Sequence, residues 1–252
     1  MKKQPFFSII TCAKNSEKYL KECLDSVAKQ TWRDFEHIFI DGYSIDKTLE
    51  IVSQYQKENP DIAIKLIQAK PRGIANAMNL GVKNSRGKII HVLHSDDYYY
   101  SEKSLQIAAY YFQKNSQTNW LVGNNIVRIK NKEFVWGWSE ILQKLYTLSS
   151  IFYHPNIFMK KQIFDNCGFF NETYKICMDY EHCLRVLKLE KPRFVRENLA
   201  VFRIHKHSAS SGTNPKNKLI IIKERFRAEA ENSDTIKKPL MFLKKELANF
   251  KK

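Results

Sequence analysis

Glycine is scarce in this 252-residue chain, and the two common glycine-rich phosphate-binding motifs are missing. There are 8 glycines, and the first apolar run is followed by Cys12-Ala13-Lys14-Asn15 rather than by a G-x-G-x-x-G sequence. No G-x-x-x-x-G-K-[ST] sequence occurs either. The sequence therefore gives no support to a dinucleotide-dependent enzyme or to a P-loop ATPase.

Cysteine and long apolar runs are also rare. The five cysteines are an odd number without C-x-x-C spacing, so we expect neither a disulfide framework nor a zinc site, and a reducing cytosol is the simpler location. No apolar stretch approaches the roughly 20 residues that cross a bilayer. The apolar run at residues 6–13 is followed at once by Lys14 and has no signal-peptide cleavage pattern. We therefore predict that it is a buried strand. We expect a cytoplasmic protein whose membrane contact is at most peripheral.

Acidic residues are outnumbered, with 26 Asp plus Glu against 42 Lys plus Arg and a formal net charge of +16. Hydrophobic residues make up 43% of the chain, which excludes a disordered or collagen-like protein. The excess positive charge predicts an anionic partner. Composition leaves that partner open among nucleic acid, an acidic membrane surface and a phosphorylated small molecule.

Short apolar runs alternate with segments of helical period in residues 1–100, which predicts β-α-β units around a mainly parallel, Rossmann-like sheet flanked by helices. The expected strands are residues 6–11, 35–40, 64–67, 88–93 and 120–129, and the expected helices are residues 19–29, 48–57, 74–84 and 103–115. Residues 1–100 would form a nucleotide-binding half, and residues 101–215 would complete the cleft. Residues 216–252, with 11 Lys plus Arg against 5 Asp plus Glu, are predicted to be a basic tail of amphipathic helices.

Acidic residues follow two of the predicted strands. Asp41 ends one strand, and Asp96 and Asp97 come just after another. Ligands of open α/β sheets bind beyond the carboxyl ends of the strands, so these acids should share one rim. Oxygen ligands favour Mg²⁺ or Mn²⁺, whereas a lone Asp-Asp pair can also cap a helix. The second acidic turn favours a metal and nucleotide site.

Seven motifs, in this order, resemble those of family 2 glycosyltransferases. They are Ser8-Ile9-Ile10-Thr11, Asp41-Gly42-Tyr43-Ser44, Gly73-Ile74-Ala75-Asn76, Ser95-Asp96-Asp97, His154, Gly168-Phe169-Phe170-Asn171-Glu172, and Asp179-Tyr180-Glu181 followed by Arg185. They span roughly residues 6–210, and their order and spacing make chance similarity improbable. The pattern most resembles the branch that builds bacterial surface polysaccharides, including O-antigen.

The resemblance implies a GT-A fold and an inverting transfer of sugar from a nucleotide-diphosphate donor to an acceptor hydroxyl. Asp41, Asn76 and Asp96 are implied to bind the nucleotide sugar, and Asp97 is implied to bind Mg²⁺ or Mn²⁺. Asp179 is implied to be the catalytic base. The resemblance further implies a saccharide or lipid-linked saccharide acceptor, a role in O-antigen or capsule assembly, and no nucleic-acid partner.

Several of these residues have a second interpretation. Asp179 could be an N-cap or first-turn carboxylate of the helix through Arg185. His154 could be an ordinary buried histidine rather than an acceptor-site residue. Arg203 and His205 resemble the late basic motif that closes over the diphosphate or metal, and they also suit a solvated loop.

The location of the basic tail and the overall activity each have alternative interpretations as well. One helical face of the tail carries Leu240, Leu243, Leu247 and Phe250 among lysines. Such a helix can lie on the anionic inner face of the plasma membrane, or pack on the catalytic domain. A sugar nucleotidyltransferase can share the acidic metal pair, and a basic nucleic-acid-binding protein would use the positive charge.

Overall fold

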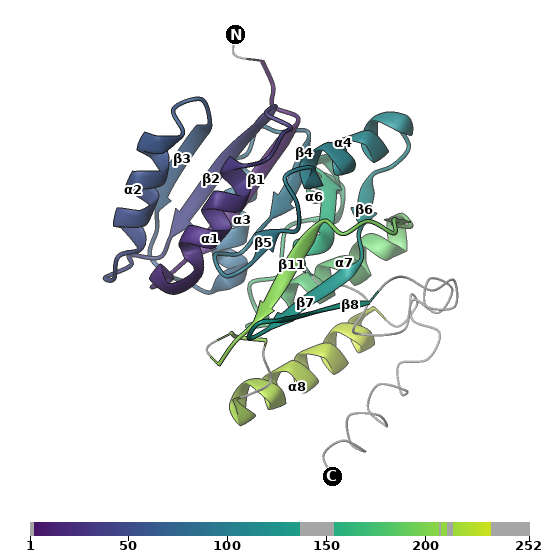
Figure 1. Cartoon of the computed structure of the whole chain (residues 1–252). Coiled ribbons are helices and arrows are strands. Elements are labelled where there is room, and N and C mark those ends of the chain that lie inside the picture. Colours follow the sequence, from purple (N-terminus) through teal and green to yellow (C-terminus); the bar gives the residue numbers. More distant parts are fainter. Residues whose placement is uncertain (1–2, 137–153, 207, 211–213, 233–252) are drawn as a thin grey trace.

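A seven-stranded sheet forms the centre of the computed structural model, which describes residues 3–136, 154–206, 208–210 and 214–232 (Figure 1). Its strands, in spatial order, are β10 (Arg193–Phe194), β6 (Trp120–Val122), β9 (Ile157–Lys160), β4 (Ile89–Val92), β1 (Phe7–Ala13), β2 (Phe35–Asp41) and β3 (Ala63–Gln68). β1 pairs in parallel with β2 and β4, and β2 with β3. Only β9 runs antiparallel to its neighbours, β4 and β6. The mainly parallel sheet is confirmed.

Helices cover both faces of this sheet. They are α1 (Glu17–Ala28), α2 (Thr48–Glu58), α3 (Ile74–Asn84), α4 (Ser104–Lys114), α6 (Gln162–Cys167) and α7 (Met178–Leu189). The side chains of β1 alternate between two apolar clusters: Ile10 belongs to the cluster that contains Met78 of α3, whereas Ile9 belongs to the cluster that contains Leu20 of α1 and Leu105 of α4. Because successive side chains of a strand point to opposite faces, α3, α6 and α7 cover one face, and α1, α2 and α4 the other. Because both faces of the sheet are covered, its strands appear in the sequence as continuous apolar runs.

A smaller, four-stranded sheet lies beside the acidic rim. Its order is β5 (Tyr98–Tyr99), β11 (Ala200–Ile204), β7 (Asn125–Ile129) and β8 (Lys132–Trp136). The prediction of a single strand at residues 120–129 is wrong. The chain leaves the large sheet after β6, at Gly123 and Asn124, and enters the small sheet as β7. β5 follows Asp97 directly, so its partner β11 is brought next to the acid pair.

The last described helix, α8 (Pro215–Glu231), packs against α7 (Figure 1). The hydroxyl of Tyr180 on α7 donates to Glu229 on α8 at 3.0 Å, and Tyr174 donates to Glu231 at 2.8 Å. The predicted tail thus begins with a helix that contacts the rest of the fold. Its predicted apolar face, Leu240, Leu243, Leu247 and Phe250, lies outside the described residues. Among the helices that are described, none is long and apolar enough to cross a membrane.

Candidate active site

A cavity of about 700 Å³ opens at the carboxyl ends of β1, β2, β3 and β4. Its wall includes Cys12 and Ala13 at the end of β1, and Ile40 at the end of β2. Met78 of α3 and Ile221 of α8 close it from the helical side. This is the edge of the sheet at which the sequence predicts ligand binding.

Three predicted carboxylates, Asp96, Asp97 and Asp179, lie on the wall of this cavity. Asp97 is 1% exposed, and its Oδ1 atom accepts the backbone N–H of Arg203 at 2.9 Å. Its Oδ2 atom is buried without a hydrogen-bond partner among the described residues. Burial, and then the charge of Asp96, raise the pKa of the Asp97 carboxyl well above its ordinary value. The side chain of Asp96 is 28% exposed and faces the cavity more openly.

A divalent cation fits this pair of acids. The orphaned oxygen of Asp97 needs a partner, and a cation would favour the ionised form of both carboxylates. Within the described ranges, no group of three or more His, Cys, Asp or Glu side chains is arranged to hold a metal. Mg²⁺ at phosphate sites is commonly held by one or two carboxylates, with phosphate and water oxygens completing its shell. Asp96 and Asp97 therefore suit a cation that binds together with a phosphorylated ligand.

Asp179 is the second residue of α7 and is partly buried. The N-cap of α7 is Cys177, so Asp179 is not the cap and lies in the first turn. Burial raises the pKa of its carboxyl above the ordinary 3.8, and the backbone N–H of Tyr180 and the charge of Arg225 act in the opposite direction. A carboxylate with a raised pKa on a cavity wall is suited to accept a proton.

Two histidines line the cavity close to Asp179. The ring centroids of His94 and His154 are 5.5 Å apart, and burial lowers the pKa of each to about 4. Both are therefore neutral at pH 7. The ring nitrogens of His154 have no hydrogen-bond partner in the described part of the chain. His94 is not among the predicted site residues, although its place directly before Ser95-Asp96-Asp97 could have identified it.

Basic side chains on the cavity wall come from unexpected segments. They are Lys14 after β1, Lys70 and Arg72 after β3, and Lys218 and Arg225 on α8. The predicted donor-site residue Asn76 is also on the wall, and its amide donates to Glu172 at 2.9 Å. The sequence predicts Arg203 and His205, rather than these five cations, as the diphosphate ligands. The cavity wall thus carries more positive charge for an anionic ligand than the sequence motifs predict.

Three predicted site residues do not belong to the wall of the cavity. Asp41 is 0% exposed, and its carboxylate accepts the backbone N–H of Ser44 and the amide of Gln68, at 3.1 and 3.2 Å. Arg203 is buried and donates through Nε to the backbone carbonyl of Asp96 at 2.9 Å. The Nε2 atom of His205 lies 3.0 Å from the Asp96 carboxylate. These residues support the wall, and their direct contact with a ligand stays a prediction.

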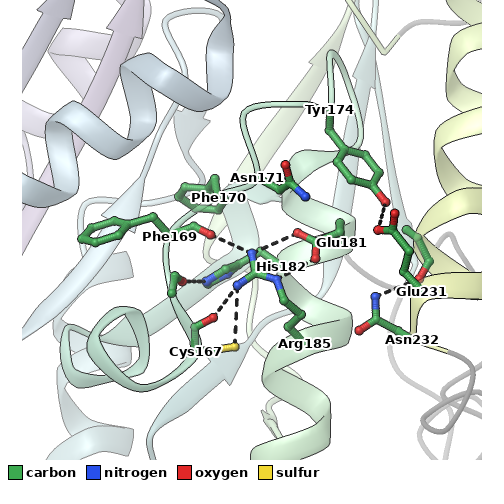
Figure 2. Close-up of polar contacts among 12 residues, drawn as sticks. Cys167, Phe169, Phe170, Asn171, Tyr174, Glu181, His182, Arg185, Glu231 and Asn232 are labelled. Atoms are coloured by element: carbon green, nitrogen blue, oxygen red, sulfur yellow. Dashed lines mark hydrogen bonds and ion pairs between the residues drawn. The ribbon is translucent and has the colours of Figure 1, made fainter.

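Arg185 joins α7 to the segment that carries the Gly168-Phe169-Phe170 motif (Figure 2). Its guanidinium pairs with Glu181 at 2.6 Å and donates to the backbone carbonyls of Cys167 and Phe169. The ring of His182 lies 3.0 Å from the carbonyl of Gly168. These contacts fix the position of α7, and hence of Asp179, against the loop before it.

The sequence comparisons match this chain to glycosyltransferases. Residues 8–191 match the family model described as glycosyl transferase family 2. A PGL/p-HBAD biosynthesis glycosyltransferase of Mycobacterium tuberculosis is 32% identical over 183 residues, which cover 72% of this chain and 69% of the relative.

Solved structures show the same arrangement of elements. S. aureus TarS 1–349, in complex with UDP-GlcNAc, superposes with a TM-score of 0.69 at 22% identity, over 91% of this chain and 69% of that one. The chain covers 41% of the longer TarS chain. The mannosyltransferase PcManGT from Pyrobaculum calidifontis, in complex with GDP-Man and Mn²⁺, gives 0.70 at 17% identity, over 95% and 68% of the two chains. At such identities, the likeness shows a shared fold.

Proposed function

The chain belongs to glycosyltransferase family 2, and on that premise we propose that it transfers a sugar from a nucleoside-diphosphate donor to an acceptor hydroxyl with inversion. The chain is a glycosyltransferase with the GT-A fold. One observation carries the proposal: Asp179, with its raised pKa, lines the same cavity as the acid pair Asp96 and Asp97. A base for the acceptor and a cation site for the donor thus share one space.

The donor diphosphate binds at the acid pair and the basic wall. Asp96 and Asp97 would hold a divalent cation, Mg²⁺ or Mn²⁺, whose charge would favour departure of the diphosphate. The sequence resemblance assigns the metal to Asp97 alone and Asp96 to the nucleotide sugar, whereas the two carboxylates share this part of the cavity wall. Lys14, Lys70 and Arg72 add positive charge on the β1 and β3 side of the cavity. The complexes of TarS with UDP-GlcNAc and of PcManGT with GDP-Man and Mn²⁺ support a donor of this type.

Asp179 removes the proton from the acceptor hydroxyl. A sugar hydroxyl is a weak nucleophile, and a positioned base raises its reactivity as the new bond forms. The neutral rings of His94 and His154 lie beside this carboxylate without adding a competing positive charge at neutral pH. Direct displacement forms no covalent sugar-enzyme intermediate, so the buried cysteines need no chemical role.

The acceptor approaches from the side of α8. Ile221 and Ile222 give this wall an apolar surface, and Lys218 and Arg225 give it positive charge. Such a wall suits an amphipathic, anionic acceptor, namely a saccharide linked to a lipid phosphate. We place this reaction in surface-polysaccharide assembly, O-antigen or capsule, at the inner face of the plasma membrane. Family membership favours transfer over the nucleotidyltransferase alternative.

Thermal unfolding with a panel of UDP, GDP, CMP and dTDP sugars, each with and without Mn²⁺, tests the proposal. A ligand that binds the folded state raises the unfolding temperature by mass action. We expect one nucleotide class to do so only with Mn²⁺, and we expect the Asp97→Asn variant to lose that effect. The absence of a Mn²⁺-dependent shift with all four donor classes would contradict the proposal.

A further inference from the structure

Glu224 of α8 accepts three consecutive backbone N–H groups from the loop before α7. Lys175 donates at 2.6 Å, and Ile176 and Cys177 each donate at 2.9 Å. Glu224 is 9% exposed and lies 47 residues beyond Cys177 in the chain. Asp179 follows this loop by two residues. One buried carboxylate on another helix therefore holds the segment that leads into the proposed base.

The chemistry of this contact favours a fixed loop. Cys177 is the N-cap of α7, and Lys175 and Ile176 precede it, so the amides of all three residues lack a carbonyl partner within the helix and need another acceptor. An ionised carboxylate forms shorter and stronger bonds with such amides than a neutral group does, and it suits the positive end of the helix dipole. A second contact, from Tyr180 to Glu229 at 3.0 Å, ties the residue after Asp179 to the same helix.

We propose that Glu224 is a positioning residue for the transfer reaction, because its carboxylate fixes the loop that sets the place of Asp179 in the cavity. The inference rests on the proposed role of Asp179 as the base. Ile176, Cys177 and Asp179 all line the cavity, so a shift of the loop moves its wall and the base together. A displacement of about 1 Å at a reacting group can lower a rate by about 100-fold.

Glu231 provides a matched control on the same helix. Its carboxylate accepts the hydroxyl of Tyr174 at 2.8 Å and pairs with Arg227 (Figure 2 shows the contact with Tyr174). It therefore contacts side chains, whereas Glu224 contacts the backbone of the loop. The Glu231→Gln variant weakens the contact of α8 with the side chain of Tyr174, and it leaves the acceptor of the amides of residues 175–177 in place.

The test compares Glu224→Gln, Glu224→Asp and Glu231→Gln in the full chain. Amide hydrogen exchange needs no substrate, and we expect faster exchange at Ile176 and Cys177 in Glu224→Gln than in the wild type or in Glu231→Gln. Release of nucleoside diphosphate from UDP-GlcNAc and from GDP-Man, each with Mn²⁺, gives kcat and KM. We expect Glu224→Gln to lower kcat by about 10- to 100-fold at unchanged KM, with partial recovery in Glu224→Asp.

Three results would overturn the inference. The first is exchange at residues 175–177 that is the same in Glu224→Gln and in the wild type. The second is an equal loss of kcat in Glu224→Gln and Glu231→Gln at equal loss of thermal stability. The third is full activity of Glu224→Gln. Normal turnover by Asp179→Asn would instead overturn the assignment of the base. Inactivity of Asp179→Asn together with full activity of Glu224→Gln would remove the positioning role alone.

Discussion

The Nε2 atom of His205 lies 3.0 Å from the Oδ2 atom of Asp96, 109 residues earlier in the chain. The backbone carbonyl of the same aspartate accepts the Nε–H of Arg203 at 2.9 Å. Both contacts come from β11 and the residue after it, so the small sheet holds Asp96 on the cavity wall. Asp97 is turned inward instead, with one oxygen on the backbone of Arg203. Neighbours in sequence thus have different surroundings.

We expect Asp97→Asn to fold and to lose cation-dependent donor binding. The change removes a carboxylate whose burial raises its pKa, so the variant without metal should be at least as stable as the wild type. The donor affinity in Mn²⁺ should fall by about 10-fold or more, because one of the two carboxylates proposed to bind the cation is gone. Calorimetric titration with and without Mn²⁺ measures this. Wild-type affinity in the variant would contradict the metal assignment.

We expect Asp179→Asn to bind the donor normally and to lose transfer by about 100- to 10,000-fold, the usual contribution of a general base. The variant should also unfold at a higher temperature at pH 7, because it no longer desolvates an ionised carboxylate. Single-turnover assays and thermal unfolding measure the two effects. A destabilised variant would show that Asp179 contributes mainly to structure.

On the acid side of the pH profile, the pH at which kcat reaches half its plateau should lie above the ordinary carboxyl pKa of 3.8. Asp179 must be ionised to accept a proton, and burial raises its pKa, so kcat should rise with pH through the raised value and then level. Between the unfolded and folded pKa values, the folded state holds more protons, so this group's contribution to stability falls as pH rises. Profiles of kcat and unfolding free energy test this, and the difference between the wild type and Asp179→Asn isolates the contribution of Asp179 to the stability change.

Asn79 should be essential for stability, whereas Asn76 on the same helix should not. Asn79 is buried, and it donates to the carbonyl of Phe170 and accepts its N–H, each at 2.9 Å. Asn79→Ala leaves both backbone groups unpaired and should lower the unfolding free energy by about 2–4 kcal/mol. Asn76→Ala loses one bond to the exposed Glu172 and should cost less than about 1 kcal/mol. Urea denaturation compares the two, and equal losses would contradict this assignment.

Local sequence patterns predict the first half of the fold well. The predicted helix at residues 19–29 is α1, Glu17–Ala28, because Leu20, Cys23, Leu24 and Val27 repeat at the spacing of one helical face. The predicted strand at residues 35–40 is β2, Phe35–Asp41, whose side chains are all buried. Parallel strands buried on both faces have a strong local apolar pattern, so their order along the chain is readable.

The rest of the site depends on contacts between distant segments, which no local pattern contains. Residues 120–129 look like one strand because β6 and β7 are both apolar, and only their partners in two sheets separate them. Whether Arg203 points to the cavity or to the carbonyl of Asp96 depends on the register of β11. The contribution of α8 to the cavity wall has the same origin.

The three bonds to Glu224 also bear on how the protein is made. During synthesis, the loop at residues 175–177 emerges before Glu224, so its amides lack that carboxylate while the sheet is already able to form. The loop acquires its partner only when α8 folds back on α7. A nascent chain that halts before residue 224 would therefore carry the large sheet without this support for the loop before Asp179. Completion of the proposed catalytic centre is thus linked to translation of the C-terminal region.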